Sequence, residues 1–274
     1  MNSSGRQRSL IVPREHGAWG ILLVPLITGA SVGLFSENGA SQLVPLTFAV
    51  LALFWLRTPV ESWIGTVPIK ARSPAEVRLV RNACLILGSL AVASLIWLFW
   101  GWRNRHLLGI GSIAALAFIG QAIVRRLWKA RTAAQMIGAA GLTAVAPAAY
   151  YVASGALNWT AWSLWILNLL FAADQIEFVQ LRIRAARAET PAEKFAIGRT
   201  FLAIQFLLVA LLAAGCACHL INWYVPLAFL PILWRGFSWF VSPFEPLVVH
   251  SLGKRELAHA VVFGILLVGS FALK

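Results

Sequence analysis

Long apolar stretches recur along the chain, and they constrain its fold more than any other feature. A membrane-spanning α-helix needs about 20 mainly apolar residues, because a helix satisfies its own backbone hydrogen bonds in hydrocarbon. Of the 274 residues, 59% are hydrophobic and only 12% are charged. This composition leaves too few polar residues to cover the surface of a water-soluble domain. The sequence therefore predicts an all-α, polytopic integral membrane protein.

We predict nine transmembrane helices that form a single transmembrane domain over residues 1–274. The predicted spans are residues 17–35, 43–63, 83–102, 107–124, 133–153, 161–181, 198–220, 224–241 and 257–273. The eighth span is the least regular, since Pro226, Pro231 and Arg235 interrupt it.

Lys and Arg concentrate in alternate connections between these spans, which predicts the orientation of the chain. Basic residues precede the first span and follow the second, fourth, sixth and eighth, whereas the other connections carry almost none. We therefore predict an integral protein of the cytoplasmic (inner) membrane, with the N-terminus cytoplasmic and the C-terminus outside. The net charge of +13 is mainly this topology signal, with attraction to anionic lipid or a phosphorylated substrate as a secondary interpretation. Nucleic-acid binding is excluded, because no water-exposed module offers a basic face.

The few acidic residues mark a candidate site. The chain has ten Asp and Glu against 23 Lys and Arg, and Asp174 is its only aspartate. Asp174 and Glu177 lie in the sixth predicted span, where a carboxylate is costly unless it faces protein, a partner or water. Two such acids also repel each other unless a cation or an arginine lies between them. We predict a functional site here that includes Asn168, Gln180 and Arg184.

Two further polar groups are predicted on the same cytoplasmic side. Arg57 and Glu61 are four residues apart in the second span, so they share one face of a helix and can form an ion pair. Arg14 and His16 lie at the start of the first span. They are either interfacial anchors or a site at which His16 binds the head group of a ligand or relays a proton.

Residues 13–25, with the sequence PREHGAWGILLVP, resemble the opening of a bacterial membrane family called YwiC-like. The specific part of the resemblance is the segment from Pro13 to Trp19. It implies a bacterial membrane protein and does not by itself imply a reaction.

A more distant resemblance is to the UbiA-type intramembrane prenyltransferases, which have nine helices, a cytoplasmic active site and Asp-rich motifs on helices two and six. Arg57, Glu61 and Gly65 occupy the spacing of the first motif, and Asp174 and Gln180 match two positions of the second. The resemblance implies a UbiA-like fold with a polar cavity open to the cytoplasm. It also implies that the polar groups of helices two and six converge on that cavity.

This resemblance implies binding or transfer of an amphipathic anionic substrate, with a membrane lipid or isoprenoid as partner. The candidate catalytic or magnesium-binding residues are Asp174, Glu177 and Glu61. The candidate substrate-binding residues are Arg14, His16, Arg57, Asn168, Gln180 and Arg184. Where the family has further aspartates, this chain has Leu181 and Arg184. Because arginine binds phosphate without a metal, we expect weak or no magnesium binding in the absence of an anionic ligand.

Besides an intramembrane transferase, the same residues are compatible with two other functions. These are a transporter and a non-catalytic, lipid-binding accessory protein. In either of these, the same acids would carry protons or a cation. Two matched halves with broken helices favour transport. The chain shows no convincing internal repeat, although Pro59, Pro147 and Pro231 allow discontinuous helices.

Overall fold

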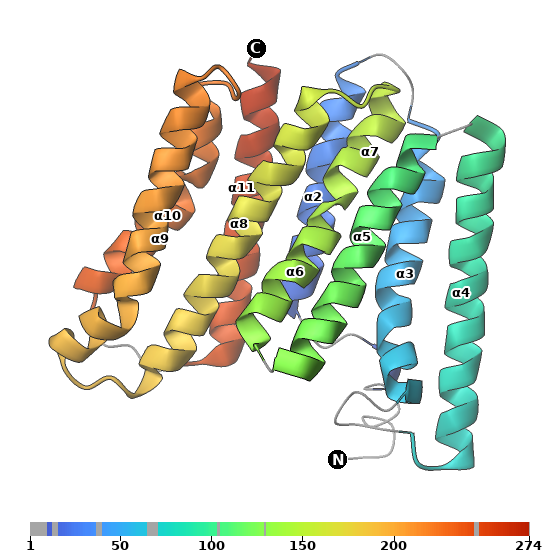
Figure 1. Ribbon diagram of the computed structural model, residues 1–274, viewed down its shortest axis with the longest axis horizontal. Helices are drawn as coiled ribbons and strands as arrows, with labels where there is room; N and C mark the ends of the chain where they lie inside the picture. Colours follow the sequence, from blue (N-terminus) through green and yellow to red (C-terminus); the bar gives the residue numbers. More distant parts are fainter. Residues whose placement is uncertain are drawn as a thin grey trace. The chain divides into compact units, whose positions relative to one another are not determined.

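The computed structural model describes residues 10–12, 16–36, 40–64, 71–102, 105–128, 130–243 and 247–273, and all regular structure among them is helical (Figure 1). The α-helices are α2 (His16–Leu34), α3 (Leu43–Ile64), α4 (Pro74–Trp102), α5 (Arg105–Ile123), α6 (Arg131–Thr143), α7 (Val145–Ser154), α8 (Trp159–Arg184), α9 (Pro191–Ala217), α10 (Val225–Val241) and α11 (Val249–Ala272). A π-helical turn, η1 (Val124–Trp128), extends α5, and a 3₁₀ turn, η2 (Ala185–Arg187), follows α8. The predicted all-α fold is confirmed.

Eight segments of the described chain are long and apolar enough to cross a membrane: α2, α3, α4, α5 with η1, α6 with α7, α8, α9 and α11. The shorter apolar helix α10 has 17 residues and corresponds to the irregular eighth span. Large apolar side chains face outward from these helices, such as Ile86 at 68% exposure and Leu116 at 67%. Such surfaces require a hydrocarbon environment, and the chain is an integral membrane protein.

Contacts divide the structure into two compact units, residues 1–16 with 39–105 and residues 17–38 with 106–274. In the first unit, α3 and α4 lie side by side in opposite directions (Figure 1). The segment before α2 is attached to α3 by two hydrogen bonds. The indole of Trp55 donates to the Ile11 carbonyl at 2.9 Å, and the Ser62 hydroxyl donates to the Leu10 carbonyl at 3.3 Å. The single transmembrane domain predicted from the sequence stays a prediction.

The start of α4 lies well before the span predicted from residue 83, because the sequence supplies a cap. The Ser73 hydroxyl accepts a hydrogen bond from the Glu76 backbone N–H at 3.1 Å. The Glu76 carboxylate accepts in return from the backbone N–H groups of Arg72 and Ser73. This reciprocal capping box satisfies donors that the first turn of a helix leaves without partners. A polar turn is therefore added to the apolar span.

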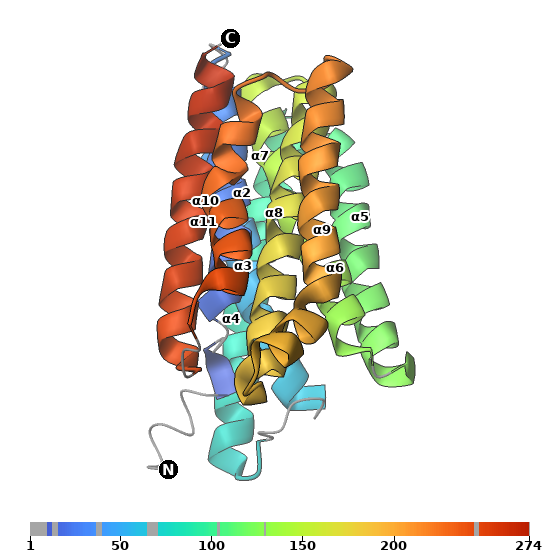
Figure 2. The ribbon, with the colours of Figure 1, turned by 90° about the vertical axis from the view of Figure 1, so that its left-hand side faces the viewer.

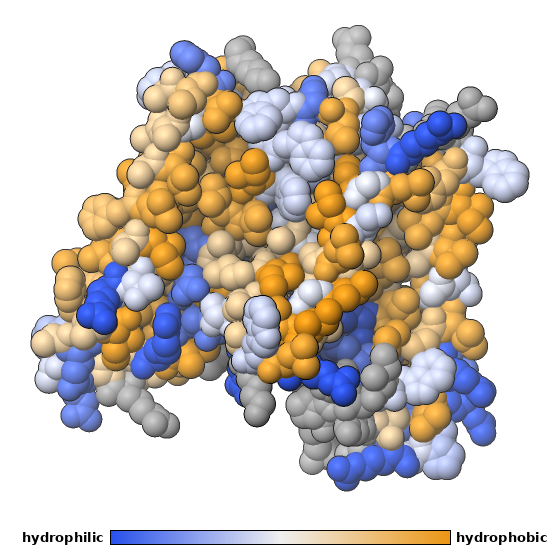
Figure 3. Space-filling model, viewed as in Figure 1, coloured by the Kyte–Doolittle hydropathy of each residue, from blue (hydrophilic) through white to orange (hydrophobic). Residues whose placement is uncertain are grey.

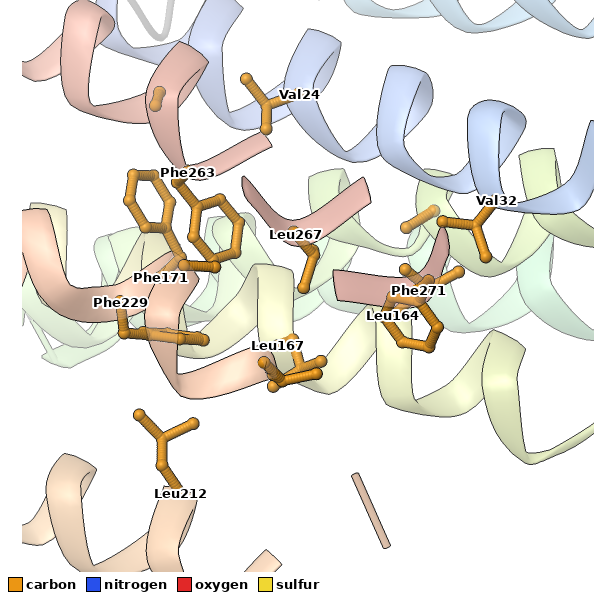
Figure 4. Close-up of a cluster of buried hydrophobic side chains, with 14 of the residues drawn as sticks. Val24, Val32, Leu164, Leu167, Phe171, Leu212, Phe229, Phe263, Leu267 and Phe271 are labelled. Atoms are coloured by element: carbon orange, nitrogen blue, oxygen red, sulfur yellow. The ribbon is translucent and has the colours of Figure 1, made fainter. Parts of the chain in front are cut away.

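Helix α8 is central to the second unit, where it packs against α6, α7, α9 and α10 (Figures 1 and 2). Three buried phenylalanines join it to α10 and α11 (Figure 4). Phe171 of α8 stacks on Phe263 of α11 with ring centroids 4.0 Å apart, and Phe229 of α10 meets Phe263 edge-on at 5.1 Å. Burial of such large rings fixes the three helices against one another.

Small residues bring α2 into direct backbone contact with α7 in the same unit. A Cβ atom on Gly29 would lie 2.2 Å from the Ala146 carbonyl oxygen, and one on Gly33 would lie 2.7 Å from the Ala153 Cβ. Glycines four residues apart at a helix interface are typical of packing between membrane helices. This contact has no space for larger side chains on α2.

The predicted fifth span is a discontinuous helix. Ala144 separates α6 from α7, and Pro147 follows in the first turn of α7. Because proline has no backbone N–H, it cannot continue the hydrogen-bond pattern of α6. Every residue of α7 is buried, so this break lies inside the second unit.

On the face of the second unit seen in Figure 3, hydrophobic side chains cover the middle of the helices. Hydrophilic side chains gather near the lower end, where α8 leads through η2 into α9. This distribution matches a helix bundle whose middle faces hydrocarbon and whose ends face water.

Candidate functional site

Asp174 lies near the middle of the buried face of α8 and is only 2% exposed. One of its carboxylate oxygens accepts a hydrogen bond from the side-chain amide of Gln205 on α9, which is fully buried. The other oxygen forms an ion pair with the guanidinium of Arg235 on α10. Asp174 is therefore not a lone acid in hydrocarbon but is bound by two neighbouring helices.

Arg235 also forms an ion pair with Glu256 of α11, through its second terminal nitrogen. The side chains of Arg235 and Glu256 are 10% and 7% exposed. One guanidinium thus joins two carboxylates from different helices. We call Asp174, Gln205, Arg235 and Glu256 the Arg235 network.

Two neighbours on α8 hold this network in place. The ring of Phe178 lies under the guanidinium of Arg235, with the central carbon 4.1 Å from the ring centroid. The side-chain amide of Gln175 donates a hydrogen bond of 2.7 Å to the backbone carbonyl of Glu256. A cation above an aromatic face and a bond to the backbone of α11 both restrict where the charges can lie.

Charge and hydrogen bonding are incompletely balanced in the Arg235 network. Two carboxylates share one guanidinium, so the fully ionised network has a net charge of −1. Gln205 Oε1, Arg235 Nε and Glu256 Oε1 are buried and have no hydrogen-bond partner among the residues that the structure describes. Buried polar atoms without partners are costly, so the hydrogen bonding of the network is incomplete at these three atoms.

Glu177 and Gln180 belong to other contacts of α8. A carboxylate oxygen of Glu177 lies 3.5 Å from a terminal nitrogen of Arg184, whose side chain is 52% exposed. The side-chain amide of Gln180 donates to Gln135 Oε1 of α6 at 3.1 Å. These residues, predicted in one site with Asp174, make their described contacts with groups outside the Arg235 network.

Asn168 is 1% exposed and connects α8 to α2. Its side-chain amide donates to the Thr28 hydroxyl at 3.2 Å and to the Leu164 carbonyl at 2.8 Å. The hydroxyl of Thr28 in turn lies 3.2 Å from the Pro25 carbonyl. These bonds give Asn168 a structural role between two membrane helices, and its substrate-binding role stays a prediction.

The pair predicted on the second span is confirmed in the first unit. Arg57 Nε donates to Glu61 Oε1 at 2.9 Å, and both side chains are about a quarter exposed, at 25% and 29%. The predicted convergence of this pair with Asp174 and Glu177 stays a prediction. Arg14 lies outside the described residues, and His16 is the first residue of α2.

No group of three or more His, Cys, Asp or Glu side chains in the described part of the chain is placed to hold a metal ion. Both oxygens of Asp174 accept bonds from other side chains of the protein. A divalent cation at Asp174 would have to replace these donors. The magnesium site considered from the sequence stays a prediction.

The partners of Asp174 were not identified from the sequence. In the sequence, Arg235 stands only as an interruption of the eighth span, and Gln205 is one polar residue in the apolar seventh span. Glu256 falls one residue before the predicted start of the ninth span, whereas α11 begins at Val249. Each is a polar residue in or beside an apolar stretch, which is a usable signal for intramembrane pairing.

A search of curated proteins and a search of solved structures each found no match. The likeness to UbiA-type enzymes therefore stays a prediction. A family model described as YwiC-like protein matches residues 12–151. The match ends before α8, so the Arg235 network lies outside the matched range. Because it covers half of the chain, this protein belongs to the YwiC-like family.

Proposed function

We propose that this membrane protein is a proton-coupled transporter of an amphipathic molecule with an anionic head group, and that the Arg235 network is its coupling site. The observation that carries the proposal is one buried guanidinium held between two carboxylates from two other helices. Ionisable residues inside a membrane protein are costly and are typical of proton relays and substrate pathways.

The fully ionised network has a net charge of −1, and binding of one proton would neutralise it. Burying an uncompensated charge is unfavourable, whereas one protonated carboxyl would leave one carboxylate for one guanidinium. The charged members are Asp174 on α8, Arg235 on α10 and Glu256 on α11, while α9 contributes the uncharged Gln205. His259, one turn along α11, contacts the Arg255 carbonyl at 2.8 Å through Nδ1.

Protonation would also change what Arg235 can bind. A protonated acid bonds the guanidinium less strongly, so donors of Arg235 become available to an anionic head group through charge-assisted hydrogen bonds, while the other carboxylate still compensates its charge. Within the described part of the chain, the Nε atom of Arg235 has no hydrogen-bond partner. In this proposal, proton uptake and anion binding are linked through a single residue, and such linkage is one requirement for coupled transport.

A magnesium-dependent transferase has less support. Such an enzyme needs carboxylate oxygens that are available to a metal and to a diphosphate, and those of Asp174 accept bonds from Arg235 and Gln205.

Infrared difference spectroscopy on the full-length protein in lipid vesicles tests the proton site directly. On acidification we expect a new absorption from one protonated carboxyl group, and we expect Asp174→Asn or Glu256→Gln to remove or shift it. Glu177→Gln is the matched control and should leave this signal unchanged, since Glu177 pairs with the exposed Arg184. An unchanged signal in both network variants would overturn the proposal.

Magnesium titration of the purified protein, followed by calorimetry, separates the two functions. We expect little heat without an anionic ligand. Tight magnesium binding that Asp174→Asn abolishes, together with a copurified isoprenoid diphosphate identified by mass spectrometry, would instead favour the transferase.

A further inference from the structure

We propose that Glu256 is the member of the Arg235 network that takes up the proton, and that Gln205 directs the proton there by holding Asp174 in its ionised form. This inference rests on the function proposed above, in which the network binds one proton. It names the group that binds this proton and a residue that positions the charge.

The two carboxylates of the network differ in their hydrogen bonds. Both oxygens of Asp174 accept a bond, one from the side-chain amide of Gln205 and one from Arg235. Glu256 accepts a bond from Arg235 through Oε2, whereas its Oε1 has no partner among the residues that the structure describes. Hydrogen-bond donors stabilise the ionised form of a carboxyl group. The ionised form is therefore better stabilised at Asp174 than at Glu256.

Burial does not reverse this order. Loss of hydration favours the neutral form of every carboxyl group. The side chains of Asp174 and Glu256 are 1% and 7% exposed, so both have lost nearly all of their hydration, and the donor from Gln205 is the main difference that remains. A proton from the solvent therefore binds Glu256 Oε1, where no described bond is lost, while Oε2 stays beside Arg235.

Glu256 is also the carboxyl group nearer to an end of the bundle. It lies seven residues after the start of α11 at Val249, whereas Asp174 lies ten residues before the end of α8 at Arg184. At 1.5 Å per residue, these separations are about 10 Å and about 15 Å along the helix axes. Both helix ends lie at the same end of the second unit (Figure 1). A proton that enters from this end reaches Glu256 first.

The charged groups around Glu256 leave one competitor for the proton. Arg235 of α10 faces it directly, and Asp174 of α8 lies across the guanidinium. Helix α2 approaches this part of α11 through the uncharged Gly20. Along α11 itself, the neighbouring groups that carry or can take up charge are Lys254, Arg255 and His259, of which the first two are exposed. Among the described residues, Asp174 is therefore the acid that competes with Glu256.

Gly236 of α10 provides the space that Gln205 occupies. A Cβ atom on Gly236 would lie 2.8 Å from Gln205 Oε1 and 2.9 Å from Gln205 Cδ. Because the amide is the end of a flexible side chain, an added methyl group would displace it more readily than it would separate the helices. Gln205 is thus a positioning residue, and the absence of a side chain at position 236 lets it reach Asp174.

Infrared difference spectroscopy with isotope labels assigns the proton, because Asp174 is the only aspartate in the chain. The full-length protein is made by cell-free synthesis with heavy carbon in the side-chain carboxyl of either aspartate or glutamate, and is measured in lipid vesicles. On acidification, we expect the band of the new protonated carboxyl to shift to lower wavenumber with labelled glutamate and to stay in place with labelled aspartate. Glu256→Gln should remove this band, and Glu177→Gln, the matched control, should retain it.

The labels separate a failure of this assignment from a failure of the coupling site. A band that shifts with labelled aspartate would overturn the assignment to Glu256 and leave the network as the proton site. If no protonated carboxyl appears on acidification, the coupling site fails and the assignment fails with it.

The role of Gln205 is tested with the same labels. Gln205→Leu removes the uncharged donor to Asp174, so we expect part of the band to become sensitive to labelled aspartate. Gly236→Ala should have the same effect, and it serves as the second variant if Gln205→Leu does not fold. Gly253→Ala, where a Cβ would meet nothing within 4 Å, should behave as the unchanged protein. A band that labelled aspartate leaves in place in both variants would show that Gln205 does not direct the proton.

Discussion

Arg235 is the residue on which the buried carboxylates of Asp174 and Glu256 depend. It is the described cationic partner of both Asp174 and Glu256. Breaking a buried ion pair by removing one partner leaves the other charge uncompensated, whereas replacing the whole network by neutral groups avoids that cost. The pair of Glu177 and Arg184 is less constrained, because its side chains are 18% and 52% exposed and a charge that remains after one substitution is partly solvated.

We therefore expect Arg235→Met to destabilise the protein by about 3–5 kcal/mol, because two buried carboxylates would lose their cation. Adding Asp174→Asn and Glu256→Gln to this variant should recover much of the loss. Thermal unfolding in detergent, followed by size-exclusion chromatography, measures both effects. Arg184→Met is the control and should change stability by at most about 1 kcal/mol. Equal losses for Arg235→Met and Arg184→Met would contradict the importance of the network.

Some features of the individual helices follow from the local sequence, whereas others depend on packing between helices. The pairing of Arg57 with Glu61 followed from their spacing alone, because residues four apart on a helix are neighbours. The capping box of Ser73 and Glu76 is equally local, yet apolar length alone did not predict that α4 begins at Pro74. Polar first turns extend membrane helices beyond their hydrocarbon-spanning part.

The contact between α2 and α7 gives a prediction at this scale. We expect Gly29→Ala to lower the unfolding temperature by several degrees, because its Cβ would lie 2.2 Å from the Ala146 carbonyl oxygen and the helices would have to separate. Gly88→Ala is the matched control on a membrane helix, since a Cβ there meets nothing within 4 Å. A fluorescence-detected melting curve of each variant makes the comparison. Loss of stability in Gly88→Ala alone would refute this account of the packing.

The whole molecule consists of nine apolar helical segments within the described residues, arranged in two compact units. If all nine segments cross the membrane, the two ends of the chain lie on opposite sides of it. The basic connections favour a cytoplasmic N-terminus. The orientation and the inner-membrane location are proposals that rest on this charge pattern.

Reporter fusions test the orientation. Alkaline phosphatase fused after Ser36, Gly155 or Lys274 should be active, because these positions are expected outside, and green fluorescent protein fused after Arg72 should fluoresce. Activity after Arg72 would reverse the orientation. A fluorescent fusion at Lys274 would exclude an odd number of spans.

The sequence by itself determined the membrane class, the approximate spans and the choice of Asp174, because hydropathy and the cost of a charge in hydrocarbon depend on composition along the chain. Only the tertiary structure decided which groups meet Asp174. Arg235 and Glu256 are 61 and 82 residues away from Asp174 in the sequence. Arg235 meets Asp174, and Glu256 meets Arg235, only because α8, α10 and α11 belong to one bundle. Pairing between helices depends on their rotation and packing, which the polarity of a single helix does not encode.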